Sequence, residues 1–218
     1  MGLVKPKERL ISADNIRVGD AILFIESSGI HANGLTMARK VADKLPDGYL
    51  TKLPDGRTYG ETLLDPTLIY VRFVEECLNR GIDIHYAINI TGHGWRKLMR
   101  AEHNFAYVVD KLPRQQPIFD FIQEHGPVDD REAYGNLNMG AGFALYVDQS
   151  DVQHVFSVMC KGWAGAYYPD IETSLVSAGH VEHSDKRRVI ICPKNLEYEG
   201  QELNIRRRLG KTRKNVEK

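Results

Sequence analysis

Three glycine-rich motifs hold the residues of this sequence that could do chemistry. The first, Ser27-Ser-Gly-Ile-His-Ala-Asn-Gly34, lies between an apolar run and a helical pattern. Small residues at such a junction let backbone amides approach an anion, and the amino terminus of the helix adds a positive dipole. The polar groups suit a phosphate or ribose hydroxyls. The sequence therefore predicts a substrate or phosphate site that includes Ser27, Ser28, Gly29, Asn33 and Gly34.

His31 is the residue of this motif that we predict to be catalytic. Because it lies between Gly29 and Gly34, we expect its imidazole to be partly exposed toward a cleft. An imidazole with an ordinary pKa of about 6.5 can contact a phosphate or transfer a proton. In the alternative interpretation, His31 caps the following helix and the glycines serve only the geometry of a turn.

The second motif is Asn89-Ile-Thr-Gly-His-Gly-Trp95, and the third is Asn136-Leu-Asn-Met-Gly-Ala-Gly142. In the second, a strand again runs into glycines and a helix, so its amides could hold a phosphate and its histidine could contact an anion or move a proton. We expect the first two motifs to face one cleft. The alternatives are a tight turn with an exposed histidine and a small-residue contact in the sheet. The further predicted contacts are Thr91, Gly92, His93, Gly94 and Asn138.

Hydrophobic periodicity and turn residues predict the elements that position these motifs. Strands are predicted over 20–25, 82–90, 105–109, 142–147, 177–182 and 188–192, with the last two forming a hairpin. Helices are predicted from Leu35, from Asp65 to the turn at Gly81, and over 95–101, 117–125, 129–134 and 150–161. Strands and helices mix without strict alternation. This pattern predicts an α/β sandwich of the α+β class rather than a doubly wound parallel sheet.

The charge of the chain argues against nucleic acid or an anionic membrane as its main partner. The 218 residues contain 29 Lys+Arg and 29 Asp+Glu, so the formal net charge is zero. The carboxy-terminal segment is basic, because residues 205–218 contain seven Lys or Arg and one acid. This composition predicts a solvated, flexible tail. A nucleic-acid-binding module that works through this tail is the weakest alternative.

Cysteine and histidine spacing predicts neither disulfides nor a metal site. The three cysteines, Cys77, Cys160 and Cys192, are far apart and form no CxxC pair. The histidines show no HxxxH or HExxH spacing. No apolar run approaches the roughly 20 residues needed to span a bilayer. We therefore expect a cytoplasmic chain without a membrane partner.

In this order, the motifs resemble the carboxy-terminal domain of aminoimidazole ribonucleotide synthetase, also called phosphoribosylformylglycinamidine cyclo-ligase. The matching segments are 19–34, 63–70, 90–94 and 127–142. The resemblance implies a layered α/β/α sandwich with a mixed sheet. It divides the chain into a linker remnant over 1–10, a synthetase domain over 11–200 and a basic tail over 201–218.

The resemblance also implies an activity and partners. Enzymes of this family close the imidazole ring of formylglycinamidine ribonucleotide with ATP and give aminoimidazole ribonucleotide in purine biosynthesis. The implied cofactors are ATP and Mg²⁺, held mostly by an amino-terminal half that we expect to be missing here. The implied partners are a phosphorylated small-molecule substrate, that amino-terminal half and, in the full enzyme, a second copy in a homodimer. The isolated chain is therefore expected to fold without closing the ring.

The second motif departs from the family pattern, which is close to HITGGG. Asn89 stands where the pattern has a histidine, and His93 stands where it has the central glycine. His93 brings a bulky side chain to a place where backbone would approach a ligand. The alternative function is therefore a non-catalytic or diverged paralogue that binds another phosphorylated ligand.

Overall fold

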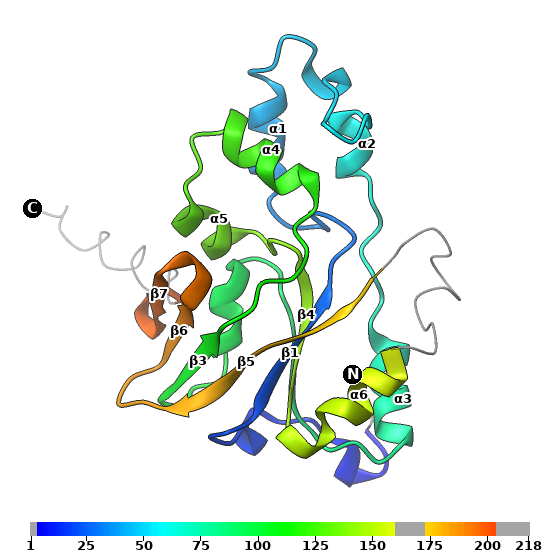
Figure 1. Ribbon diagram of the computed structural model, residues 1–218, viewed down its shortest axis with the longest axis vertical. Helices are drawn as coiled ribbons and strands as arrows, with labels where there is room; N and C mark the ends of the chain where they lie inside the picture. Colours follow the sequence, from blue (N-terminus) through cyan, green and yellow to red (C-terminus); the bar gives the residue numbers. More distant parts are fainter. Residues whose placement is uncertain (1–3, 160–172, 204–218) are drawn as a thin grey trace, which may run out of the picture.

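The computed structural model describes residues 4–159 and 173–203 (Figure 1). Within these residues, seven strands form one sheet in the order β2-β4-β1-β5-β3-β6-β7. Neighbouring strands are antiparallel, except that β3 and β6 are parallel. The strands are β1 (Ala21–Glu26), β2 (Ile84–Asn89), β3 (Phe105–Val109), β4 (Ala141–Val147), β5 (Leu175–His183), β6 (Arg188–Ile191) and β7 (Leu196–Glu199). The predicted α+β class with a mixed sheet is confirmed.

Both faces of the sheet are buried, which explains why β1 is apolar at every position except its last. Successive side chains of a strand point to opposite faces. Ile22 and Phe24 accordingly belong to one core cluster, whereas Leu23 and Ile25 belong to another. The first cluster includes residues of α1 (Leu35–Ala42), α2 (Tyr59–Leu63), α4 (Pro117–His125) and α5 (Asp130–Asn136), and the second includes residues of α3 (Val71–Asn79) and α6 (Val152–Met159).

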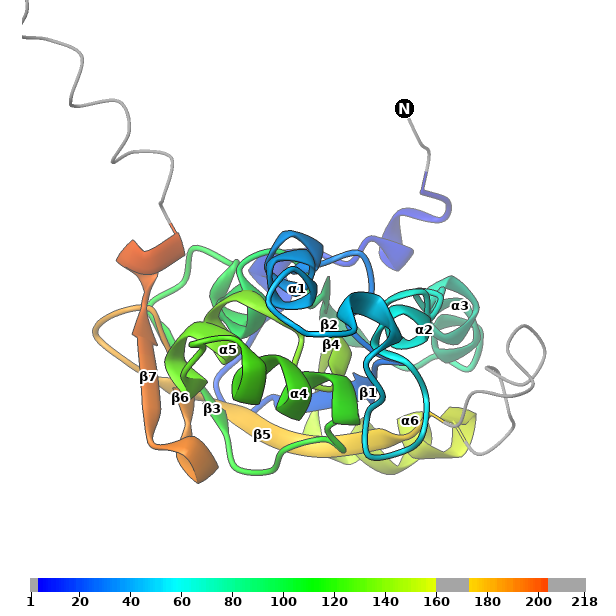
Figure 2. The ribbon, with the colours of Figure 1, turned by 90° about the horizontal axis from the view of Figure 1, so that it is seen from above.

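The helices therefore lie on both faces of the sheet, as the layered sandwich requires. Figures 1 and 2 show α1, α4 and α5 grouped apart from α3 and α6. Short 3₁₀ helices complete the described part of the chain: η1 (Lys7–Arg9), η2 (Ala13–Asn15), η3 (Gly48–Leu50), η4 (Gly94–Met99), η5 (Gln149–Asp151), η6 (Cys192–Lys194) and η7 (Gly200–Leu203).

Local capping sets the ends of several helices. The Asp129 carboxylate accepts a hydrogen bond from the Glu132 amide at 2.7 Å and starts α5. Pro117 opens α4, where its missing amide hydrogen costs nothing, and Gly126 follows the last residue of that helix. The predicted limits of α4 are confirmed, whereas α5 runs two residues beyond its predicted end.

The predicted helix start at Asp65 is wrong. Helix α3 begins at Val71, and residues 65–70 are not helical. The Asp65 carboxylate is held by both terminal nitrogens of Arg57, at 2.6 and 3.0 Å, so it is not available to cap a helix. The next residue also has a tertiary role, because the Pro66 carbonyl accepts a hydrogen bond from the Ser28 hydroxyl at 2.6 Å.

The predicted hairpin between the last two strands is also wrong. Strand β3 lies between β5 and β6 and pairs with both. Strand β7 was not predicted, and it supplies the antiparallel partner of β6. The predicted helix over 95–101 is the 3₁₀ helix η4, and the predicted end of α6 at Lys161 falls outside the described residues.

The described part of the chain ends in η7, which includes the first residues of the predicted basic tail. Leu203 is buried and belongs to the first core cluster. The remainder of the predicted basic tail, residues 204–218, falls outside the described part of the chain, as does Cys160.

Candidate functional site

The strand directions bring the three glycine-rich motifs to one end of the sheet. Strands β1 and β2 flank β4, and both are antiparallel to it. The carboxyl ends of β1 and β2 therefore meet the amino end of β4, with Glu26 opposite Ala141 and Asn89 opposite Phe143. The loops that follow β1 and β2 and the loop that precedes β4 are consequently neighbours (Figure 1).

Asn138 of the third motif holds the first motif in place. Its Oδ1 accepts hydrogen bonds from the Ser27 hydroxyl and the Gly140 amide, both at 3.0 Å. Its Nδ2 donates to the carbonyls of Gly29 and Ile30, at 2.9 and 3.2 Å. The side chain is fully buried and its amide is saturated by the protein. The geometry therefore favours a positioning role for Asn138 over the predicted contact with a ligand.

Two glycines are required where the loops touch. Gly94 has φ +50°, and a Cβ there would overlap the Tyr134 carbonyl oxygen and lie 2.8 Å from the Asn136 amide nitrogen. Gly34 has φ +80°, and a Cβ there would overlap the side chain of Leu137. Both glycines thus let the first two motifs pack against the third.

The predicted exposure of His31 is wrong, because only 6% of the residue is exposed. Its Nε2 accepts a hydrogen bond from the Ser28 amide at 3.2 Å, while the Ser28 hydroxyl donates to Pro66. Burial lowers the pKa of His31 to about 4, although the nearby Asp65 carboxylate opposes this shift. The imidazole is therefore neutral at pH 7, and the predicted pKa of about 6.5 does not apply. Such a group shapes the loop and is poorly suited to act as a general acid.

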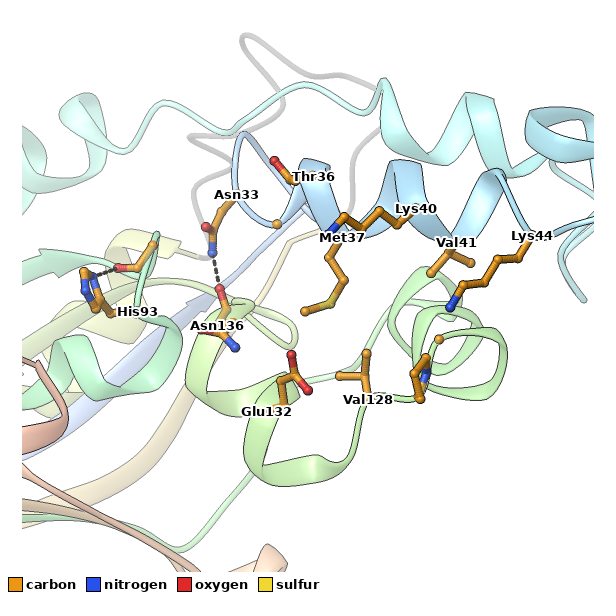
Figure 3. A pocket seen from close by; sticks show the side chains of 14 residues that line it. Asn33, Thr36, Met37, Lys40, Val41, Lys44, His93, Val128, Glu132 and Asn136 are labelled. Carbon is orange, nitrogen blue, oxygen red and sulfur yellow. Dashed lines mark hydrogen bonds between the residues drawn. The ribbon is translucent and has the colours of Figure 1, made fainter. Parts of the chain in front are cut away.

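One pocket of about 530 Å³ opens between α1 and the loop that connects α4 to α5 (Figure 3). This volume lies within the range of small-molecule sites. Figure 3 shows the side chains of α1 on one side, those of Val128, Glu132 and Asn136 on the other, and His93 at one end. The lining residues are Asn33, Gly34, Thr36, Met37, Lys40, Val41, Lys44, Gly92, His93, Gly126, Pro127, Val128, Glu132 and Asn136.

The expectation that the first and second motifs face one cleft is confirmed. The Asn33 side chain donates from Nδ2 to the Asn136 carbonyl at 2.6 Å. Its Oδ1 faces the second motif, because a Cβ on Gly92 would lie 3.8 Å from it. Four predicted residues therefore share the pocket lining, namely Asn33, Gly34, Gly92 and His93, whereas Ser27, Ser28, Gly29, His31, Thr91, Gly94 and Asn138 lie outside it.

Sequence reasoning missed the lysines of this pocket. Lys40 lies on the exposed face of α1 and Lys44 lies in the turn just after the helix, and neither makes an ion pair with another described residue. Met37 and Val41 supply the apolar wall beside them. Spacing by four residues from Thr36 places both lysines on the same side of a helix, so helical periodicity after the first motif could have indicated them.

A buried cation lies behind the second motif. The Arg96 guanidinium donates to the carbonyl oxygens of His93, Gly135 and Glu202 and to Oδ1 of Asn136, at 2.6 to 3.3 Å. Burial lowers the pKa of Arg96, but a guanidinium remains charged. No carboxylate of the described residues forms an ion pair with it. Arg96 therefore joins the second and third motifs and adds positive charge to this end of the sheet.

The described residues contain neither a metal-binding cluster nor a membrane-spanning helix. No group of three or more His, Cys, Asp or Glu side chains there could hold a metal ion. None of the helices in 4–159 and 173–203 is long and apolar enough to cross a membrane.

A mixed sheet with helices on both faces and three glycine-rich loops closed on one another defines the class of this domain. The chain matches the family described as AIR synthase related protein, C-terminal domain, over residues 17–165, and it belongs to that family.

The similar curated proteins are phosphoribosylformylglycinamidine cyclo-ligases. The chain is 39% identical to the enzyme of Methanocaldococcus jannaschii over 163 residues, which is 74% of this chain and 46% of that protein. It is 40% identical to the enzyme of Methanopyrus kandleri over 172 residues, which is 79% of this chain and 46% of that protein. The chain thus spans less than half the length of these relatives.

Solved structures share the fold. Hydrogenase maturation protein HypE matches with a TM-score of 0.55 and 18% identity, covering 90% of this chain and 56% of that chain. T. maritima PurL complexed with FGAR matches with a TM-score of 0.53 and 14% identity, covering 89% of this chain and 29% of that chain. At these identities the likeness shows the fold alone.

Proposed function

We propose that the chain is the carboxy-terminal, substrate-binding half of an ATP-dependent phosphoribosylformylglycinamidine cyclo-ligase. The full enzyme closes the imidazole ring of formylglycinamidine ribonucleotide to aminoimidazole ribonucleotide in purine biosynthesis. The observation that carries this proposal is the shared pocket of the first two motifs, in a chain 39–40% identical to enzymes of that name.

In this proposal the pocket binds and orients the ribonucleotide. The side chains of Lys40 and Lys44 attract its phosphate, and the apolar wall of Met37 and Val41 contacts the sugar. Asn33 and the backbone of Gly92 hold the polar end of the substrate. Orientation of the formyl oxygen and the attacking nitrogen is the contribution of this half to catalysis.

The cofactors are assigned to the other half of the enzyme. Magnesium prefers carboxylate oxygens and phosphates, and the described residues contain no cluster that could hold it. We therefore propose that ATP and Mg²⁺ are held mostly by an amino-terminal half. The full enzyme is proposed to be a cytoplasmic homodimer.

Reconstitution tests this proposal. The chain is mixed with the amino-terminal half of the Methanocaldococcus jannaschii relative, and aminoimidazole ribonucleotide is measured with ATP, Mg²⁺ and formylglycinamidine ribonucleotide. We expect ring closure by the mixture and none by either half. Ring closure by the isolated chain would contradict the proposed division of roles between the two halves. A mixture in which the two halves associate and bind the substrate, but which remains inactive, would contradict the proposed reaction.

Asn89 and His93 favour a second candidate, a diverged paralogue that binds another phosphorylated ligand. Both residues differ from the family pattern near the pocket, and His93 lines it. Tight binding of a related ribonucleotide without binding of formylglycinamidine ribonucleotide would favour this candidate.

A further inference from the structure

An exposed apolar strip follows the segment that runs from α2 to α3 (Figure 1). It consists of Leu64, Pro66, Ile69 and Val71, and we call it the 64–71 strip. Leu64 is 82% exposed, Ile69 55% and Val71 60%. Single exposed apolar residues are common on proteins, whereas several gathered on one surface are typical of an interaction site.

Polar contacts hold the backbone beneath the strip. Both terminal nitrogens of Arg57 bind the Asp65 carboxylate, at 2.6 and 3.0 Å. The Ser28 hydroxyl donates a hydrogen bond to the Pro66 carbonyl at 2.6 Å, which ties the strip to the first glycine-rich loop. The segment is therefore fixed in place, although residues 65–70 belong to no helix or strand.

Burial alternates along the second part of the strip. Leu68 and Tyr70 are buried and belong to the second core cluster, whereas Ile69 and Val71 are exposed. Because the core holds every second side chain, the exposed ones have fixed positions. Their exposure is thus a property of the folded domain and presents a preformed apolar surface to a partner.

The relatives indicate which partner covers this surface. The chain belongs to a family described as a C-terminal domain, and more than half of each cyclo-ligase relative lies outside the match, which covers 46% of the protein in the two relatives described above. The described chain also starts against the helix that Val71 opens, because Nη2 of Arg9 donates to Oδ1 of Asn79 in α3 at 2.8 Å. A half that precedes this domain is therefore attached beside the strip.

We infer that the 64–71 strip is the surface on which the amino-terminal half of a cyclo-ligase docks. This inference rests on the proposed function and names the contact between its two halves. An apolar centre excludes water from such an interface, as in other stable contacts between proteins. Because Ser28 holds Pro66, docking on the strip also places the partner half next to the first glycine-rich loop.

Association of the 218-residue chain with the amino-terminal half of the Methanocaldococcus jannaschii relative tests this inference, with the dissociation constant measured by calorimetry. The double substitution Ile69→Asp with Val71→Asp should weaken association by at least about tenfold, because burying a carboxylate without a partner is costly. Both positions are exposed in the isolated chain, and an acidic residue at the start of α3 suits the helix dipole. We therefore expect the thermal midpoint of the isolated variant to be unchanged.

Val18→Asp is the matched control. Val18 is 53% exposed and precedes β1, whereas the strip is tied to Ser28 beyond the other end of that strand. This variant should associate like the unmodified chain. The exchange Ile69→Val with Val71→Ile keeps the surface apolar, and it should also preserve association.

Unchanged association of the double aspartate variant overturns the inference while the proposed function stands. Self-association of the isolated chain that the same variant abolishes assigns the strip to a second copy and overturns the inference as well. Failure of the unmodified halves to associate overturns both proposals. A mixture that associates through the strip, binds the substrate and does not close the ring overturns the proposed function and leaves the docking surface in place.

Discussion

The Ser27 hydroxyl donates a hydrogen bond to Oδ1 of Asn138 at 3.0 Å, across 111 residues of sequence. Both side chains are buried. The bond ties the loop that leaves β1 to the loop that enters β4. Ser27 and Asn138 do not line the pocket, but their hydrogen bond thus fixes the loops that form its polar end.

Replacement of Asn138 by leucine should destabilise the protein by about 3 kcal/mol. Leucine has a similar volume but leaves the Gly140 amide and the carbonyls of Gly29 and Ile30 without the partner that Asn138 provides, and each such group costs about 1–3 kcal/mol. Urea denaturation measures the change. Gln201→Ala, at an exposed position, serves as the control. A loss below about 1 kcal/mol for Asn138→Leu would show that the loops do not depend on this side chain.

Alanine at Gly94 should cost more stability than alanine at Gly81. Both glycines have positive φ, +50° and +76°, so both substitutions carry the left-handed penalty of about 1–2 kcal/mol. A Cβ on Gly81 meets nothing within 4 Å, whereas one on Gly94 overlaps the Tyr134 carbonyl oxygen. We expect a difference of at least about 2 kcal/mol in the free energy of unfolding. Equal losses would mean that the second and third motifs can separate without cost.

His31 should make the stability of the protein fall as the pH is lowered from about 6.5 to 4. Its pKa is lowered to about 4 in the folded state, against about 6.5 in an unfolded chain. Between these values the unfolded chain binds a proton that the folded protein does not, so acid favours unfolding and the contribution is complete above pH 6.5. The full shift corresponds to at most about 3 kcal/mol.

Denaturation of the protein and of His31→Asn at several pH values between 7.5 and 4 measures this contribution. Asparagine tolerates positive φ and does not titrate, so it is a suitable replacement. The difference between the two curves removes the contributions of the carboxylates they share. Parallel curves would show that His31 is protonated in the folded protein as readily as in the unfolded chain.

The double substitution Lys40→Ala with Lys44→Ala should weaken binding of formylglycinamidine ribonucleotide by about tenfold at low salt. Each exposed lysine contributes up to about 1 kcal/mol to an ionic contact, and salt screens it. Calorimetry at about 50 and 500 mM salt compares the variants, with the loss expected to shrink at high salt. Arg39→Ala is the control, because Arg39 is on the same helix but outside the pocket lining. An equal loss for Arg39→Ala would point to a long-range effect of charge.

Elements with strong local signals could be predicted from the sequence, and elements decided by distant partners could not. Helix α4 has a proline at its first position and a glycine after its last, so its limits could be predicted. The start of α3 could not, because Asp65 resembles a helix cap until its ion pair with Arg57 is known. The partner of β6 could not be predicted either, since β3 lies between two strands that are adjacent in sequence.

The candidate site, like the fold, could be predicted from the sequence only in part. The convergence of Asn33 and Gly92 on one pocket could be predicted, because both follow strands and precede helices. The burial of His31 could not, since it depends on how the loop folds over Ser28 and Pro66. The helical position of Lys40 could be predicted, but its place in a pocket could not, because the opposite wall comes from Val128 and Glu132, far away in sequence.

The pairing of β1 has a consequence for the order in which the protein folds during its synthesis. Ala21 pairs with Val147 on one side and with His180 on the other. Of the described strands, β1 is synthesised before both of its partners, and neither of its edges is covered until β4 has emerged. Contacts so distant in sequence slow folding, because a long loop must close before they form. We therefore expect the first glycine-rich loop to reach its final shape late, after β4 has emerged and supplied Asn138.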